Sequence, residues 1–275
     1  MATIVTKDDI TKALTGLGIA EGDTVLVHSA LRSVGKIEGS AQTVIDAIEG
    51  IIGKEGTLVM PTFSQVDFTN SYKTWYMDKP SDTGYLTEYF RKLPFVYRSN
   101  QETHSVAARG KLAYELTYQH KWFGPHICHY GEYAFADSSP WKKMYDMNAK
   151  VLFFGVTMAH FTFKHMVESR AVEYFLSQMK GEAREKFKNG LATPETIYDA
   201  EAYWMYYSSA KMQPVLTELG LVKEAPCGDA TLYLVNAKDA CEKTYEIIMS
   251  EPTNWFGPKA YAHVTEGIEA SKNID

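Results

Sequence analysis

Cysteine and long hydrophobic runs are both scarce in this sequence. Its 275 residues include only 3 cysteines, Cys128, Cys227 and Cys241. An odd number of cysteines, without a basic-then-apolar leader before the first expected helix, predicts a reduced, cytoplasmic protein. The longest apolar runs, such as residues 151–156, are far shorter than the roughly 20 residues that cross a bilayer. We therefore expect no membrane-spanning segment.

The sequence also lacks an excess of positive charge. It has 28 Lys+Arg against 34 Asp+Glu, a net charge of −6. A protein that binds a phosphate backbone normally carries a basic stripe, so this balance argues against a nucleic-acid partner. A mildly acidic protein is better suited to attract a polycationic small molecule. With 45% hydrophobic residues, the chain can bury a sizeable core, and we expect a single domain over 1–275.

Several catalytic motifs are missing. The sequence contains no Walker loop, no strand-linked G-x-G-x-x-G, no G-x-S-x-G elbow and no H-E-x-x-H. Their absence removes support for nucleotide hydrolysis and for the common hydrolase templates.

Helices and strands are expected to alternate along much of the chain. Two strands joined through a helix are most simply parallel, and ligands of such sheets gather beyond the carboxyl ends of the strands. The predicted fold class is α/β, with a central, largely parallel or mixed sheet flanked by helices in two lobes around a cleft. The expected helices cover residues 6–17, 40–52, 163–179, 198–219 and a segment from 237, and the expected strands cover 24–27, 57–60, 151–156 and 231–235.

Polar side chains follow two of the expected strands. His28 and Ser29 end the strand over 24–27, and Asp67 comes after the strand over 57–60. A carboxylate at this edge is placed to orient an imidazole or to hold a cationic substrate. The plainer alternative is that Asp67 serves as a cap or turn residue in a loop.

His165 and Glu168 form a candidate pair for acid–base chemistry. They stand three residues apart at the start of an expected helix that follows a buried strand, so they share a face near the sheet's carboxyl edge. This placement fits a general base. The alternative is that His165 hydrogen-bonds a core backbone group and that Glu168 is a solvated acid favoured by the helix dipole.

Two further segments carry a less specific pattern. His104 and Ser105 stand at the start of a helix or strand, which is also typical of a capped helix start. Residues 28–35 combine hydroxyls, Arg32 and a glycine beyond a strand, a composition suited to a phosphate or pyrophosphate.

Residues 126–132 hold the densest group of metal-binding side-chain types. His126, Cys128, His129 and Glu132 lie within this segment, but no second C-x-x-C or H-x-x-x-H completes a zinc site. The pattern favours a surface loop with incidental histidines. A zinc-dependent hydrolase built on this segment is the alternative hypothesis.

Short motifs spread along the chain form one ordered series. They are Gly22-Asp23, VHSALRSVG (27–35), GTLVMPTFS (56–64), Arg98-Ser99, HSVAARG (104–110), Ser139-Pro140-Trp141, VLFFGV (151–156) and Thr162…His165…Glu168. Taken together they resemble the aminoglycoside 3-N-acetyltransferase family, over about residues 6 to 256. The larger acetyltransferase superfamily carries a Q/R-x-x-G-x-G/A pyrophosphate loop, which this chain lacks. The resemblance therefore implies a fold distinct from the GNAT fold.

The resemblance implies an enzyme that acetylates the 3-amino group of the 2-deoxystreptamine ring of an aminoglycoside, with acetyl-coenzyme A as co-substrate and no metal. It implies His165 as the catalytic general base and Asp67 as its acidic companion, with Glu201 or Asp199 as a second acid. Glu168, Asp67 and Asp199 are the carboxylates expected to hold the cationic acceptor. A homodimer is compatible with the resemblance. The residues implied near coenzyme A are Leu31, Arg32, Ser33, Val34, Gly35, His104, Ser105 and Val106.

The chain departs from the family pattern at two places. Gln101-Glu102 stand where the family usually has His-Pro, and residues 161–164 read F-T-F-K where the family often has N-T-T-L. Bulky Phe161 and cationic Lys164 predict an acceptor pocket of different shape and charge. An amino sugar or another small amine of a biosynthetic pathway is therefore an alternative acceptor, and a non-catalytic coenzyme A-binding relative is a further alternative. Antibiotic resistance does not follow from the resemblance alone.

Overall fold

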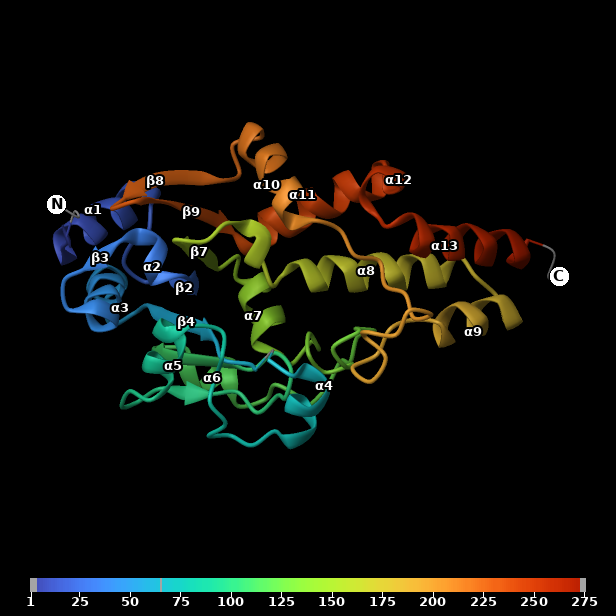
Figure 1. Ribbon diagram of the computed structural model, residues 1–275, viewed down its shortest axis with the longest axis horizontal. Helices are drawn as coiled ribbons and strands as arrows, with labels where there is room; N and C mark the ends of the chain where they lie inside the picture. The colour runs from blue at the N-terminus through green and yellow to red at the C-terminus, as the bar shows by residue number, and fades with distance from the viewer. Residues whose placement is uncertain (1–3, 65, 273–275) are drawn as a thin grey trace.

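A central sheet of 7 strands organises the computed structural model, which describes residues 4–64 and 66–272 (Figure 1). The order across the sheet is β5-β6-β4-β2-β7-β9-β8. The inner strands β4, β2 and β7 are parallel, and the outer strands run antiparallel to their neighbours. The sheet is therefore mixed, which confirms the predicted fold class. Its strands are β2 (Thr24–Ser29), β4 (Thr57–Pro61), β5 (Tyr97–Arg98), β6 (Val106–Gly110), β7 (Lys150–Phe154), β8 (Lys223–Cys227) and β9 (Ala230–Asn236); β1 (Ile4–Val5) pairs separately with β3 (Lys36–Ile37).

One face of the sheet is covered by α1 (Lys7–Leu17), α3 (Ser40–Ile52) and α5 (Tyr85–Arg91). The predicted capping box is present: the Thr6 side chain accepts from the Asp9 amide, and the Asp9 carboxylate accepts from the Thr6 amide. Side chains alternate between the two faces of a strand, so Val25 and Val27 pack under these helices while Leu26 points to the other core.

The second face of the sheet carries a larger core. It packs against α6 (Ala113–Thr117), α7 (Pro140–Asp146), α8 (Lys164–Ser177) and α11 (Ala237–Ser250). From the sheet, α8 runs toward α9 (Gly181–Asn189) and α13 (Pro258–Ser271), which lie at the opposite end of an elongated molecule from α1 (Figure 1). The remaining helical segments are α2 (Leu31–Val34), α4 (Phe68–Ser71), η1 (Tyr72–Thr74), η2 (Met158–His160), α10 (Ser209–Glu218) and α12 (Pro252–Trp255).

The helix predicted over residues 198–219 is much shorter in the structure. α10 begins only at Ser209, and residues 201–207 run without helix. This irregular segment buries Trp204, Met205 and Tyr207 in the larger core. Burial of these large side chains, rather than helical hydrogen bonding, determines the path of the segment, so the prediction was wrong for its first half.

Two other expectations can be checked here. All three cysteines are buried and unpaired in the structure. Among the helices within 4–64 and 66–272, none has both the length and the apolar character needed to cross a membrane.

Candidate active site

The carboxyl ends of β2, β4 and β7 meet at one pocket of about 520 Å³. His28 and Ser29 from β2, Pro61 from β4 and Val156 just after β7 line it together with His165. Gly155 lets β7 end close to the first loop: its φ is +74°, and an added Cβ would lie 2.6 Å from the Ala30 carbonyl oxygen. The predicted location of a site at this edge of the sheet agrees with the geometry.

His165 is held by Glu168 one turn further along α8. The two are three residues apart, and His165 Nδ1 lies 2.9 Å from Glu168 Oε2. When Glu168 is ionised its carboxylate can only accept, so in that state Nδ1 carries the proton and Nε2 keeps its lone pair. This is the tautomer that a general base needs.

Glu168 is completely buried, and every contact supports its position beneath His165. Trp204 donates from Nε1 to Oε2 at 3.3 Å, and the Tyr207 amide donates to Oε1 at 3.4 Å. Lys164 Nζ lies 3.5 Å from Oε1. Burial raises the pKa of Glu168, while the Lys164 charge and these donors oppose that rise.

Three imidazoles gather at this point. The ring of His165 lies 5.4 Å from that of His104 and 5.1 Å from that of His129, measured between centroids. Tyr130 and Phe135 complete the wall around His165, with centroids at 4.9 and 5.7 Å. Burial lowers the pKa of His165 well below its usual value, and the neighbouring Lys164 charge lowers it further. His165 is therefore neutral at neutral pH.

His104 is fixed by its backbone. The Gln101 side chain accepts from the amides of Thr103 and His104, and Trp141 Nε1 donates to the His104 carbonyl at 2.8 Å. Gln101, one of the departures from the family pattern, thus shapes the turn that carries His104. The other two residues of this block are Ser105 and Val106. Ser105 Oγ hydrogen-bonds Thr62 Oγ1 at 3.2 Å, and Val106 is buried in β6.

The first loop lines a second pocket of about 630 Å³. Leu31, Arg32 and Gly35 contribute to its wall, and Ser29 and Ala30 border both this pocket and the one that contains His165. Ser33 is exposed and Val34 is buried, and neither lines the pocket. Three of the five loop residues predicted near coenzyme A therefore face one cavity.

The three acids predicted beside His165 lie elsewhere. Asp67 is exposed in a left-handed conformation (φ 52°), and its carboxylate accepts from Asn70 Nδ2 at 3.1 Å. Asp199 and Glu201 are exposed on the irregular segment before α10. None of the three lines the pocket that contains His165. The structure instead places Glu168 in contact with the imidazole.

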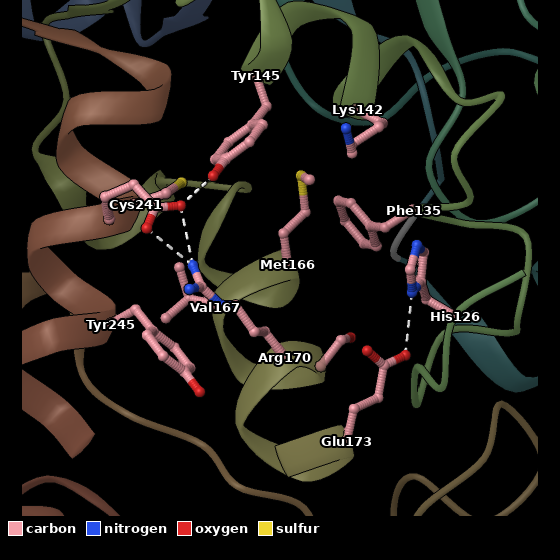
Figure 2. A pocket seen from close by; sticks show the side chains of 12 residues that line it. His126, Phe135, Lys142, Tyr145, Met166, Val167, Arg170, Glu173, Cys241 and Tyr245 are labelled. Atoms are coloured by element: carbon pink, nitrogen blue, oxygen red, sulfur yellow. Dashed lines mark hydrogen bonds and ion pairs between the residues drawn. The ribbon is translucent and has the colours of Figure 1, made fainter. Parts of the chain in front are cut away.

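The side chains of residues 126–132, on which the alternative zinc hypothesis rests, do not converge on one point. His126 bonds to Glu173 and Asp137, each at 3.0 Å, whereas His129 turns toward His165 and Glu132 is exposed. His126 lines a separate pocket of about 370 Å³, whose lining does not include His165. Figure 2 shows His126 in this pocket, opposite Glu173 of α8.

Three residues of the site carry no chemical motif in the sequence. In the sequence, His129 is one of the two histidines of the 126–132 segment, and Trp204 and Tyr207 lie in a segment for which the pattern predicts a helix. The many aromatic residues in 203–207 indicate burial, but the sequence does not predict that this segment contacts Glu168.

Comparison with known proteins gives a consistent result. A family model described as aminoglycoside 3-N-acetyltransferase matches residues 26–248. A relative named aminoglycoside N(3)-acetyltransferase VII, from Streptomyces paromomycinus, is 30% identical over 185 residues, which are 61% of this chain and 61% of that relative. The alignment thus spans less than two thirds of the relative's length.

Solved structures share the fold. A mutant of aminoglycoside acetyltransferase AAC(3)-IVa in complex with a gentamicin superposes with a TM-score of 0.68 at 21% identity, covering 98% of each chain. AAC-IIIb in a binary complex with CoASH superposes with a TM-score of 0.65 at 19% identity, covering 93% of this chain and 99% of that one. At these identities the likeness shows the fold alone.

Proposed function

Because this chain belongs to the aminoglycoside 3-N-acetyltransferase family, we propose that it transfers the acetyl group of acetyl-coenzyme A to an amine of a cationic acceptor. One observation carries the proposal: a neutral His165, hydrogen-bonded to buried Glu168, lines a pocket that adjoins the pocket of the first loop. A histidine beside two adjoining cavities supports a transfer between two substrates.

His165 performs the proton transfer. An alkyl ammonium cannot attack a thioester until it loses a proton, and His165 Nε2 accepts it as the amine nitrogen bonds to the acetyl carbonyl carbon. The carbon–sulfur bond then breaks: the sulfur takes up the proton held by His165 and leaves as the thiol, and the second proton lost by the ammonium nitrogen passes to water. The low pKa of His165 keeps the accepting form populated at neutral pH.

Glu168 acts through His165. Its side chain is 0% exposed, so no acceptor touches it, and its role is to fix the Nδ1–H tautomer and stabilise the imidazolium. This differs from the substrate-binding role that the resemblance implied. We therefore assign Glu168 as a positioning residue.

Asp67 acts on the acceptor rather than on the imidazole. It lines an open hollow with Asp82, and Asp82 also lines the pocket of His165. Two carboxylates on one path to the base attract a cationic substrate. Asp199 and Glu201 are exposed on the segment before α10 and line neither of these two cavities.

The first-loop pocket suits coenzyme A. Arg32 is exposed at this pocket and forms no ion pair with any described residue, so its guanidinium is available for a phosphate. Ser29 and Ala30, at the junction of the two pockets, are where the thioester end would pass toward His165. When bound, acetyl-coenzyme A supplies the activated acyl group.

The lead acceptor is an aminoglycoside, and another amino sugar or small amine is the second candidate. Phe161 and Lys164 line the His165 pocket, and Lys164 places a positive charge where a polycation would bind. That observation favours an acceptor with fewer amines. A cytoplasmic location and a homodimer stay predictions.

Release of thiol from acetyl-coenzyme A, measured across aminoglycosides and simple amino sugars, tests the proposal. We expect acceptor-dependent turnover that is lost in His165→Ala and kept in His263→Ala, whose histidine lies away from the pocket and stacks on Tyr203. Full turnover in His165→Ala would contradict the assignment of the base. Binding of coenzyme A without turnover on any acceptor would favour the non-catalytic alternative.

A further inference from the structure

His129 is a buried imidazole with no hydrogen-bond partner. Its side chain is 0% exposed, and neither ring nitrogen is bonded to any of the residues that the structure describes. Aromatic rings enclose it, with centroids at 4.1 Å for Tyr130, 4.6 Å for Trp204 and 5.0 Å for Tyr206. Buried polar atoms are almost always satisfied, so an orphaned imidazole in a tight site calls for a ligand.

Two metal-binding side chains stand beside it. One ligand atom each from His129, His165 and Glu168 lie within 4.8 Å of one another. Nitrogen and oxygen ligands of tetrahedral zinc lie about 2.0–2.2 Å from the ion, hence roughly 3.4 Å apart. Binding of the ion therefore requires the ligand atoms to move from their present separations of up to 4.8 Å to that distance.

We propose that His129, His165 and Glu168 form a binding site for a divalent transition-metal ion of the zinc class, and that the bound ion takes His165 out of proton transfer. Two imidazoles and one carboxylate suit zinc, cobalt or iron, and not the all-oxygen sites of magnesium or calcium.

The surroundings set the selectivity of this site. Lys164 Nζ, 3.5 Å from Glu168 Oε1, places a positive charge beside the ion. Hard cations are held mainly by charge and are therefore disfavoured. Ions that bond strongly to imidazole nitrogen are retained.

The functional consequence is that the ion competes with a proton for His165. Glu168 lies on the Nδ1 side of His165, so an ion shared with Glu168 binds Nδ1 and leaves the imidazole proton on Nε2. Nε2 then cannot accept a proton from the acceptor amine, so the loaded protein is inactive and a chelator restores it. Inhibition by the ion, the second half of the proposal, rests on the proposed function. Binding of the ion does not depend on that function.

Titration of the chelator-treated full chain with Co²⁺ and Zn²⁺, without substrates, tests the site. We expect wild type to show the visible absorption of protein-bound Co²⁺ and one binding event by calorimetry. His129→Gln is expected to lose affinity by more than the roughly 10- to 100-fold that loss of an outer partner costs. His126→Gln, from the same loop but outside the cluster, is the matched control and binds as wild type does.

Circular dichroism and melting of each variant establish that it folds. Glu168→Gln is a second variant that removes a ligand by a different route. Absence of Co²⁺ binding to wild type, or equal binding to wild type and a folded His129→Gln, overturns the site.

Inhibition by Zn²⁺ is measured as the fraction of each variant's own metal-free rate that remains. We expect strong inhibition of wild type and little of His129→Gln. Equal inhibition of both overturns the second half of the proposal. A chain that binds Co²⁺ through His129 but acetylates no acceptor overturns the proposed function and leaves the metal site standing.

Discussion

Two histidines that bond to glutamates of α8 have pKa values shifted in opposite directions. His165 bonds to Glu168 at 2.9 Å, and His126, from the loop beside α8, bonds to Glu173 at 3.0 Å. Burial holds the pKa of His165 well below its usual value. Bonding to Glu173 and Asp137 raises the pKa of half-exposed His126 to about 9 against a smaller burial effect. The hydrogen bond alone does not determine the charge of a histidine: the degree of burial decides it.

The largest expected effect is a difference in turnover between variants that lack one histidine or the other. We expect His165→Ala to lose about 10²- to 10⁴-fold in turnover, the usual contribution of a general base. His126→Ala keeps most of the rate, because its ring lines a different pocket. Thiol release under saturating acceptor measures both, and comparable losses in the two variants would contradict the assignment.

Substitution of the acids compares a buried partner with an exposed one. Glu168→Gln loses a buried charged hydrogen bond of about 1.5–3 kcal/mol, so kcat falls by about 10- to 100-fold. It also shifts the acid limb of the pH profile downward, because the imidazolium loses its stabilising charge. A purely structural role for Glu168 would leave that limb in place.

Asp67→Asn is the exposed counterpart. An exposed charge contributes at most about 1 kcal/mol, so we expect KM for cationic acceptors to rise roughly fivefold or less, with kcat unchanged. Steady-state kinetics separate the two constants. A large loss of kcat in Asp67→Asn would restore it as the companion of His165.

Substitution of Lys164 is expected to move the acid limb of the pH profile in the opposite direction. Its charge lowers the pKa of His165, so Lys164→Met raises that pKa. The acid limb of kcat/KM then moves toward higher pH, which a pH series on both proteins measures. An unchanged or lower limb would show that Lys164 does not act on His165 electrostatically.

The smallest expected effect is the change in the free energy of unfolding when His126 is replaced. Its pKa in the folded protein is about 9, above the usual 6.5. Its stabilisation is therefore complete below pH 6.5 and is lost as pH rises through 9. His126→Gln should reduce the free energy of unfolding by on the order of 1 kcal/mol in mildly acidic buffer, and by little in alkaline buffer. Urea unfolding at both pH values checks this, and equal losses would contradict it.

Local patterns of the sequence predicted much of the fold. The capping box at Thr6, the buried strand over 24–27 and the crossover to 57–60 depend on neighbours in sequence, and all are present. β8 was not predicted, because Lys223, Glu224 and Pro226 lack the pattern of a buried strand. It forms at the edge of the sheet by pairing with β9, where proline and charge are tolerated.

The site was only partly predictable. The spacing of His165 and Glu168 places both on one helix face, so their proximity followed from helical geometry. The burial of Glu168 by Trp204 and Tyr207, and the arrival of His129 beside His165, depend on contacts between segments about 36 residues or more apart. No local pattern encodes such contacts.

The antiparallel pairing of β9 with β7 has a consequence for synthesis of the chain. Until residues 230–236 leave the ribosome, the inner strand β7 has an unpaired edge, although β2 and β4 are already made. Unpaired edges of partly made proteins are prone to associate. Translation paused before Ala230 would therefore expose the most hydrophobic strand of the sheet, and we expect the nascent chain to depend on chaperones in that interval.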